Sequence, residues 1–212
     1  MPVIGAQVQP AEIPQLRCPR CWFAAPMAPS ASLTFRCMRC EWPFTLAAPS
    51  LSAAPVFPAT TVTVTSPYPT PVAATITLNG ATITSFTING AAAGAITAGT
   101  YIIPANGTFT AVYSVASPTW AWALPATSAS VVAGGLALTF APTGTNVAFA
   151  QGQVLIVDPA GTSDVVTVTG TPTATNVPVS SLNAAHNSAV PVTVAALTPY
   201  LSSVEAVPLT AY

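Results

Sequence analysis

Four cysteines in the N-terminal region have the spacing of a metal site. Cys18 and Cys21 form one C-x2-C pair, and Cys37 and Cys40 form a second pair after fifteen intervening residues. Two such pairs can surround one Zn2+ tetrahedrally with four thiolate sulfurs at about 2.3 Å. A module of about 30 residues has too little apolar core to fold alone, so the metal would supply its stability. The sequence therefore predicts a structural Zn2+ site with a closed coordination shell.

Two other uses of these cysteines remain open, namely two disulfides and a rubredoxin-like iron site. Two close pairs are poor disulfide staples, and no feature marks the chain as secreted. The start at Met1 lacks a basic region followed by an apolar run, and no apolar stretch is long enough for a membrane span. The pattern resembles zinc ribbons in general, which are structural more often than catalytic.

All four arginines of the chain lie beside these cysteines. Four thiolates and one Zn2+ carry a net charge of −2, so we expect the arginines to offset that charge. A contact with a phosphate group or an acidic partner is the alternative. The arginines are Arg17, Arg20, Arg36 and Arg39, and the aromatic residues that flank the two pairs are Trp22, Phe23, Phe35, Trp42 and Phe44.

Candidate catalytic residues are few. The chain has one histidine, His186, and no lysine. A Ser/His/Asp triad with Asp158 or Asp164 would be an enzyme's use of these groups, but the sequence lacks a G-x-S-x-G elbow. Asp158 and Asp164 could instead share a Ca2+, although two carboxylates without EF-hand spacing are a weak signal. We expect His186 to hydrogen-bond within a loop and the protein to have no enzymatic activity.

The rest of the chain is almost free of charge. From Trp42 to Tyr212 the charged side chains are only Asp158, Asp164 and Glu205. Charged residues make up 4% of the chain, against roughly 25% in ordinary soluble domains. Such a surface is weakly protected from association, so we expect partner subunits to cover it. The net charge of −1 argues against a nucleic-acid partner.

The elements that must position these residues are predicted to be strands. The hydrophobic fraction is 51%, and Thr and Val in alternation favour pleated strands over helices. We expect an all-β fold, with an N-terminal zinc ribbon followed by two small antiparallel β-sandwich or barrel-like domains. The predicted units are an extended arm over residues 1–16, the ribbon over 17–46, a Pro-rich linker over 47–60, β domain 1 over 61–126 and β domain 2 over 127–212.

Turn signals suggest how the first domain begins. Asn79-Gly80 between alternating runs is a strong hairpin signal, and it would pair Ile76 with Ile83. Phe86 follows Ile83 by three residues, so in a regular strand their side chains would lie on opposite faces of the sheet. Either the strand crosses between two cores, or a bulge near Ser85 resets the register. Alternating aromatic residues downstream predict strands over 109–115 and 120–124.

Strands of the second domain are expected every 8–12 residues, as in sandwiches and small barrels. The candidates are Leu136–Phe140, Val147–Phe149, Val154–Val157, Val165–Thr169, Val177–Val179 and Pro191–Val194.

Two stretches carry a resemblance to a known group of proteins. The run from Gly99-Thr100-Tyr101 through Ser117-Pro118-Thr119-Trp120, and the run from Phe149-Ala150-Gln151 through the His186 segment, resemble β-rich head and tail proteins of tailed bacteriophages. The resemblance implies a structural virion protein of the capsid-decoration or minor-capsid type. Its partners would be the major capsid protein or other virion subunits, and it would form a homo-oligomer, with a trimer favoured. A tail, baseplate or cell-surface binding module is the alternative, and it would present Trp120 and Trp122 in an exposed groove.

Overall fold

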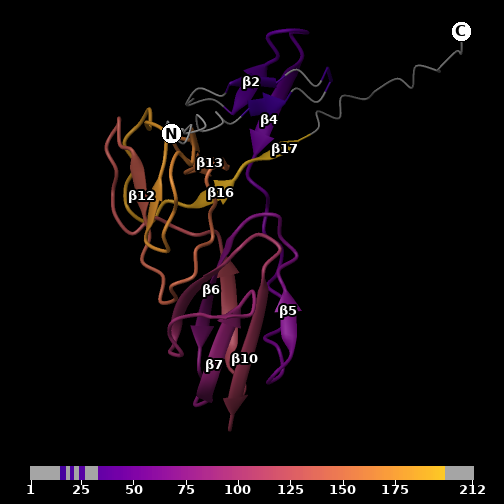
Figure 1. Cartoon of the computed structure of the whole chain (residues 1–212), viewed down its shortest axis with the longest axis vertical. Coiled ribbons are helices and arrows are strands. Elements are labelled where there is room, and N and C mark those ends of the chain that lie inside the picture. The colour runs from indigo at the N-terminus through magenta and orange to yellow at the C-terminus, as the bar shows by residue number, and fades with distance from the viewer. Residues whose placement is uncertain (1–14, 18–19, 22–23, 27–32, 199–212) are drawn as a thin grey trace, which may run out of the picture.

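The protein is an all-β molecule, as the sequence predicts. The structure, a computed structural model, describes residues 15–17, 20–21, 24–26 and 33–198. Within these residues every regular element is a strand, and there is no helix that could cross a membrane. Figure 1 shows one β domain at the lower end of the long axis, a second beside it higher up, and the cysteine-containing strands at the upper end.

Domain 1 is a sandwich of two antiparallel sheets. Their inner faces enclose an aromatic core that includes Phe86, Tyr101 and Phe109, and Trp120 and Trp122 pack against it half-buried. One sheet has the order β5-β10-β7-β8, with strands β5 (Thr63–Thr65), β10 (Thr108–Ser114), β7 (Thr82–Ile88) and β8 (Ala91–Ala92). The other has the order β11-β6-β9, with strands β11 (Thr119–Ala123), β6 (Val72–Thr77) and β9 (Gly99–Ile103).

The Asn79-Gly80 turn forms, but the hairpin predicted around it is wrong. Both turn residues have positive φ, 52° and 82°, and the Ala81 N–H donates to the Leu78 carbonyl. The flanking strands β6 and β7 nevertheless belong to different sheets, so Ile76 does not pair with Ile83. The turn chemistry is local, whereas Ile76 and Phe86 are buried from opposite sheets of one core.

Of the two alternatives left open for this strand, the bulge near Ser85 is the one that forms. Ser85 pairs with Val112, but Ile83 pairs with Tyr113, so β7 has one residue more than β10 at this point. This extra residue returns Ile83 to the same face as Phe86, and both side chains contact the core of domain 1.

The linker predicted over residues 47–60 is part of domain 1 rather than a free spacer. Phe57 is buried in the core, and Leu51 packs against it. The Pro55 carbonyl accepts a 2.7 Å hydrogen bond from the indole of Trp120, and the Pro58 carbonyl accepts one from Tyr113. These contacts fix the linker across the side of the sandwich.

The main sheet of domain 2 buries apolar side chains on both of its faces. This sheet has the order β14-β13-β16, with strands β14 (Asp164–Thr167), β13 (Val154–Val157) and β16 (Val192–Val194), and a second sheet joins β12 (Ala137–Thr139) to β15 (Asn176–Pro178). Leu155 and Val166 face the core shared with β12 and β15, whereas Ile156 and Val165 face the cysteine-containing strands. The strand predicted at Val147–Phe149 is wrong, since this segment has no ladder partner.

A strap, residues 142–146, ties domain 2 to the edge of domain 1. The Thr143 N–H donates to the Thr100 carbonyl of β9, and the Thr145 N–H donates to the Ala93 carbonyl. Gly94, with φ of 84°, lies so close that an added Cβ would collide with the Thr145 side chain. The strap therefore covers one sheet edge of domain 1, which protects it from pairing with other chains.

We expect Gly94→Ala to lower the free energy of unfolding by about 2–4 kcal/mol, from backbone strain and overpacking against Thr145. Gly152→Ala is the matched control, because Gly152 has nearly the same φ, 87°, with no atom near its Cβ position. Its cost should be only the strain, about 1–2 kcal/mol. Urea unfolding of both variants measures the difference, and equal losses would show that the strap does not constrain Gly94.

Candidate metal centre

Two short hairpins hold the cysteine pairs. Strand β1 (Gln15–Arg17) pairs with β2 (Ala24–Pro26), and β3 (Thr34–Arg36) pairs with β4 (Pro43–Ala47). Cys21 lies between the strands of the first hairpin, and Cys37 and Cys40 lie between those of the second. Antiparallel pairing of Arg36 with Pro43 leaves residues 37–42 to form the second turn.

The second turn is shaped to present sulfur atoms. The Cys37 N–H donates to the Trp42 carbonyl at 3.0 Å, and the Glu41 N–H donates to the Cys37 carbonyl at 2.8 Å. Glu41 adopts a positive φ of 56°, which reverses the chain after Cys40. The Arg39 N–H points back at the Cys37 sulfur, 3.4 Å away. Backbone hydrogen bonds thus fix the position of the Cys37 sulfur before any ligand is bound.

Three of the four predicted ligands come together. The sulfurs of Cys21, Cys37 and Cys40 all lie within 4.8 Å of one another, and those of Cys21 and Cys37 are 3.5 Å apart. Sulfurs around a tetrahedral ion with bonds of about 2.3 Å are about 3.8 Å apart, so this cluster has the dimensions of a thiolate metal site. All three cysteines carry free thiols. The fourth predicted ligand, Cys18, lies outside the described residues.

The surroundings of Cys37 favour its thiolate form. Burial raises the pKa of this thiol, but hydrogen bonds from the backbone of Cys40 and Arg39 and from the side chains of Cys21 and Cys40 outweigh the burial. The net result lowers the pKa from 9.0 to about 6. Thiolates are the form that binds metal, so the site is suited to a cation at neutral pH.

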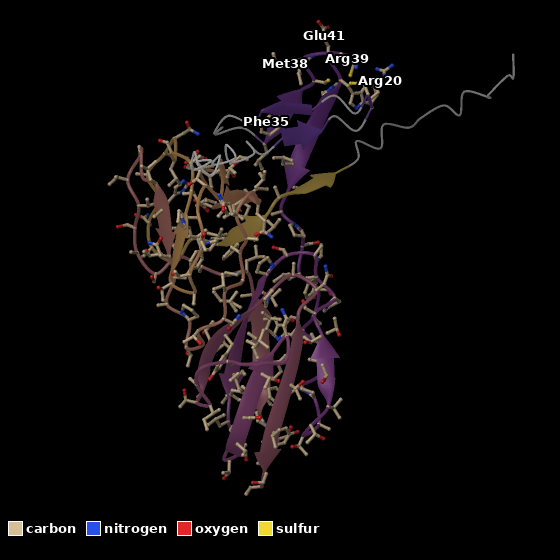
Figure 2. The ribbon with its side chains drawn as sticks, viewed as in Figure 1. Arg20, Phe35, Met38, Arg39 and Glu41 are labelled. Atoms are coloured by element: carbon tan, nitrogen blue, oxygen red, sulfur yellow. The ribbon has the colours of Figure 1, made fainter. Side chains whose placement is uncertain are left out.

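Arg20, Arg36 and Arg39 are exposed, and Arg20 and Arg39 lie at the outer end of the molecule. Figure 2 shows Arg20 and Arg39 beside Met38 and Glu41 at this end, while Phe35 lies nearer the body. The Arg20 guanidinium lies 4.6 Å from the centre of the Trp42 ring, a cation–π contact. Among the described residues, no carboxylate pairs with Arg20, Arg36 or Arg39.

The cysteine-containing strands are fastened to domain 2 by the last described strand of the chain. Strand β17 (Ala196–Thr198) pairs with β4, directly after β16 leaves the domain 2 sheet. Leu46 of β4 is 2% exposed and packs against Ile156 and Val165. Phe35 contacts both this cluster and the one around Cys37. It therefore connects the cysteine cluster to the contact between β4 and the main sheet of domain 2. The sequence carries no signal for this closure.

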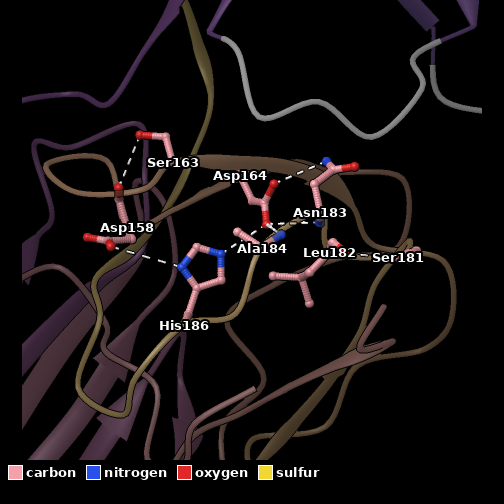
Figure 3. A network of polar contacts seen from close by, with 8 residues as sticks. All are labelled: Asp158, Ser163, Asp164, Ser181, Leu182, Asn183, Ala184 and His186. Atoms are coloured by element: carbon pink, nitrogen blue, oxygen red, sulfur yellow. Dashed lines mark hydrogen bonds and ion pairs between the residues drawn. The ribbon is translucent and has the colours of Figure 1, made fainter. Parts of the chain in front are cut away.

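The structure also gathers His186 with both candidate aspartates, but in a buried position (Figure 3). The Asp164 carboxylate accepts hydrogen bonds from the Asn183 and Ala184 N–H groups, from the Asn183 side chain, and from His186 Nε2 at 3.0 Å. His186 Nδ1 lies 4.0 Å from Asp158 Oδ2. The side chains of His186 and Asp164 are 0% exposed, which closes them to a substrate.

This network fastens a loop of domain 2. Asp164 begins β14, and its four hydrogen bonds hold residues 183–186 against that strand. Ser163, the neighbouring hydroxyl, donates to the Asp158 backbone carbonyl instead of to His186. The geometry thus matches the loop hydrogen bonding expected of His186.

No protein-family model, curated protein or solved structure matches this chain.

Proposed function

We propose that this chain is a structural virion protein that decorates or cements a phage capsid, with the zinc ribbon as its anchor and the two β domains as its oligomeric body. The observation that carries the structural role is the lack of surface charge. Over residues 42–198 the charged side chains are Asp158 and Asp164, of which Asp164 is fully buried and Asp158 is 23% exposed. A body with so little exposed charge is poorly protected from association, and burial against other subunits would explain such a surface.

The ribbon is suited to be an anchor. Its sulfur cluster favours Zn2+, which prefers four thiolates in a closed tetrahedral shell without an open site for chemistry. Its strands are fixed to domain 2 through Leu46, so a force on the ribbon is transmitted to the body. The exposed guanidinium groups of Arg20 and Arg39 suit an acidic surface on a neighbouring subunit.

The phage assignment depends on the resemblance of residues 99–122 and 149–190 to β-rich head and tail proteins. Under this proposal the partners are the major capsid protein or other virion subunits, and the chain assembles as a homo-oligomer, with a trimer favoured by the resemblance. Buried area shared among several subunits raises the free energy needed to separate them, which is the physical meaning of cementing.

The tail or cell-surface alternative receives less support from the aromatic residues. It calls for Trp120 and Trp122 to line an exposed groove, but both side chains are half-buried against the domain 1 core. Phe57 contacts the Trp120 ring, with centroids 4.8 Å apart. These contacts are those of core residues.

Labelling of native particles tests the proposal. Antibodies against the chain are expected to mark the heads of purified virions, and cross-linking mass spectrometry is expected to join the ribbon to the major capsid protein. Label confined to tails would support the tail alternative. Recovery of the chain only outside particles would contradict a virion role.

A further inference from the structure

We propose that two copies of this chain associate through strand β11, which pairs antiparallel with β11 of the second copy around a two-fold axis at Ala121. Such pairing would occur in the isolated chain, whether or not the protein belongs to a phage particle. Among the described strands, β11 and β9 are the longest edge strands, with five residues each, and the strap covers β9.

Strand β11 has no ladder partner on its outer side, and the linker meets it at the Trp120 side chain through Pro55 and Phe57. Its backbone hydrogen bonds within the described residues are those to β6 alone. It contains no charged residue, no proline and no bulge, which are the features that normally prevent edge-to-edge pairing. Thr119, Ala121 and Ala123 are exposed, so small side chains flank the edge on the outer face. A second strand therefore meets no steric or electrostatic obstacle from β11 itself.

The flank of β11 also carries the two most exposed large apolar side chains of the described chain. Val56 is 89% exposed, and its neighbours Pro55 and Phe57 both contact the Trp120 ring. Val115, which is 90% exposed, lies in the connection from β10 to β11. It has a φ of 75°, and the Ala116 N–H donates to the Ser114 carbonyl across it, which makes a strained γ-turn. We therefore include Val115 in the proposed contact, since strained residues cluster at functional sites.

The sequence of β11 indicates that the partner is a second copy. Thr119-Trp120-Ala121-Trp122-Ala123 reads nearly the same in both directions, with tryptophans on either side of Ala121 and small residues beyond them. Antiparallel pairing about Ala121 would place Trp120 opposite Trp122 of the second copy, and Trp122 opposite Trp120. Such cross-strand aromatic pairs stabilise sheets, and a two-fold contact requires this self-complementarity. The absence of charge leaves nothing to select a charged partner instead.

Sedimentation velocity of the full chain over a range of micromolar concentrations tests the pairing. A contact based on one edge strand is small, so we expect a concentration-dependent equilibrium between monomers and dimers. Ala121→Lys places two like charges opposite each other at an exposed position, and it should weaken the dimer by at least about tenfold. Val132→Lys adds the same charge at a 71% exposed position of domain 2 and should leave the dimer unchanged.

A covalent trap provides an independent measurement. Directly opposite residues of an antiparallel pair have Cα atoms about 4.5–5.5 Å apart, within the range that a disulfide spans. Ala121→Cys in the metal-loaded chain should therefore give a dimer linked through position 121 on mild oxidation with glutathione disulfide, whereas Val132→Cys should not. Mass spectrometry of the linked peptide identifies the bond.

Three results would overturn the inference: a chain that stays monomeric throughout, a dimer unaffected by Ala121→Lys, or no linkage at position 121. A trimer that tolerates Ala121→Lys would also overturn it while supporting the oligomer implied by the resemblance. A β11 dimer that never labels virion heads would instead leave this inference standing and contradict the proposed function.

Discussion

Replacing Cys37 with serine is expected to remove the metal ion and to unfold the ribbon. Cys37 is 5% exposed, and its sulfur contacts the Cys21 sulfur at 3.5 Å. Loss of this ligand opens the tetrahedral shell, and in small metal modules the metal-binding free energy is largely the folding free energy. Elemental analysis should find about one zinc ion per chain in the natural protein and almost none in the variant.

The loss should extend into domain 2. Phe35 and Leu46 contact Ile156 and Val165, so an unfolded ribbon uncovers the outer face of the β14-β13-β16 sheet. Uncovering such a cluster is comparable to truncating a core leucine, so we expect a destabilisation of about 3–5 kcal/mol. Thermal unfolding of the chelator-treated natural protein should show the same downward shift in Tm.

Met38→Ser is the control for this experiment, because Met38 lies between the two ligands of the turn but is 83% exposed. It should keep both the metal and the stability. Full zinc content in the Cys37→Ser variant would show that the cluster is not the metal site. Iron in place of zinc would give the protein a visible colour and would support the rubredoxin-like alternative.

Asp164→Asn is expected to cost about 3–5 kcal/mol of unfolding free energy. The carboxylate accepts four hydrogen bonds with no solvent access. An amide would turn its NH2 group toward some of those donors and would leave buried N–H groups without acceptors. Urea unfolding monitored by tryptophan fluorescence measures the loss.

Asp158→Asn is the matched change at the other aspartate beside His186. Asp158 is 23% exposed, its nearest oxygen is 4.0 Å from Nδ1, and asparagine tolerates its φ of 53°. We expect a cost of less than about 1 kcal/mol. Similar losses for the two variants would mean that burial and hydrogen bonding of Asp164 do not set the stability of this loop.

The sequence alone predicted those structural features that are caused by residues close together in the chain. Cysteine spacing predicted the sulfur cluster of Cys21, Cys37 and Cys40, because each C-x2-C pair occupies one turn. Thr and Val alternation predicted the all-β class. The spacing of Ile83 and Phe86 predicted an irregularity in this strand, either a crossing between two cores or a bulge, and the structure has the bulge.

The sequence alone did not predict which strands pair when the partners are far apart in the chain. Asn79-Gly80 determined a turn but not which sheets its strands join, since that choice depends on how the two sheets close around one core. The segment 147–149 contains the apolar residues Val147 and Phe149 but has no ladder partner in the fold, so the expected strand did not form.

The cysteine cluster and the nearly uncharged body are therefore properties of the sequence by itself, because they follow from residue types and short spacings. Tertiary structure alone decided that β17 returns to pair with β4, that His186 meets both aspartates in the interior, and that β11 is left as an unprotected edge. Each of these depends on contacts between residues far apart in the chain. These contacts contribute free energy only once the domains have packed, so they cannot be predicted from any short segment of the sequence.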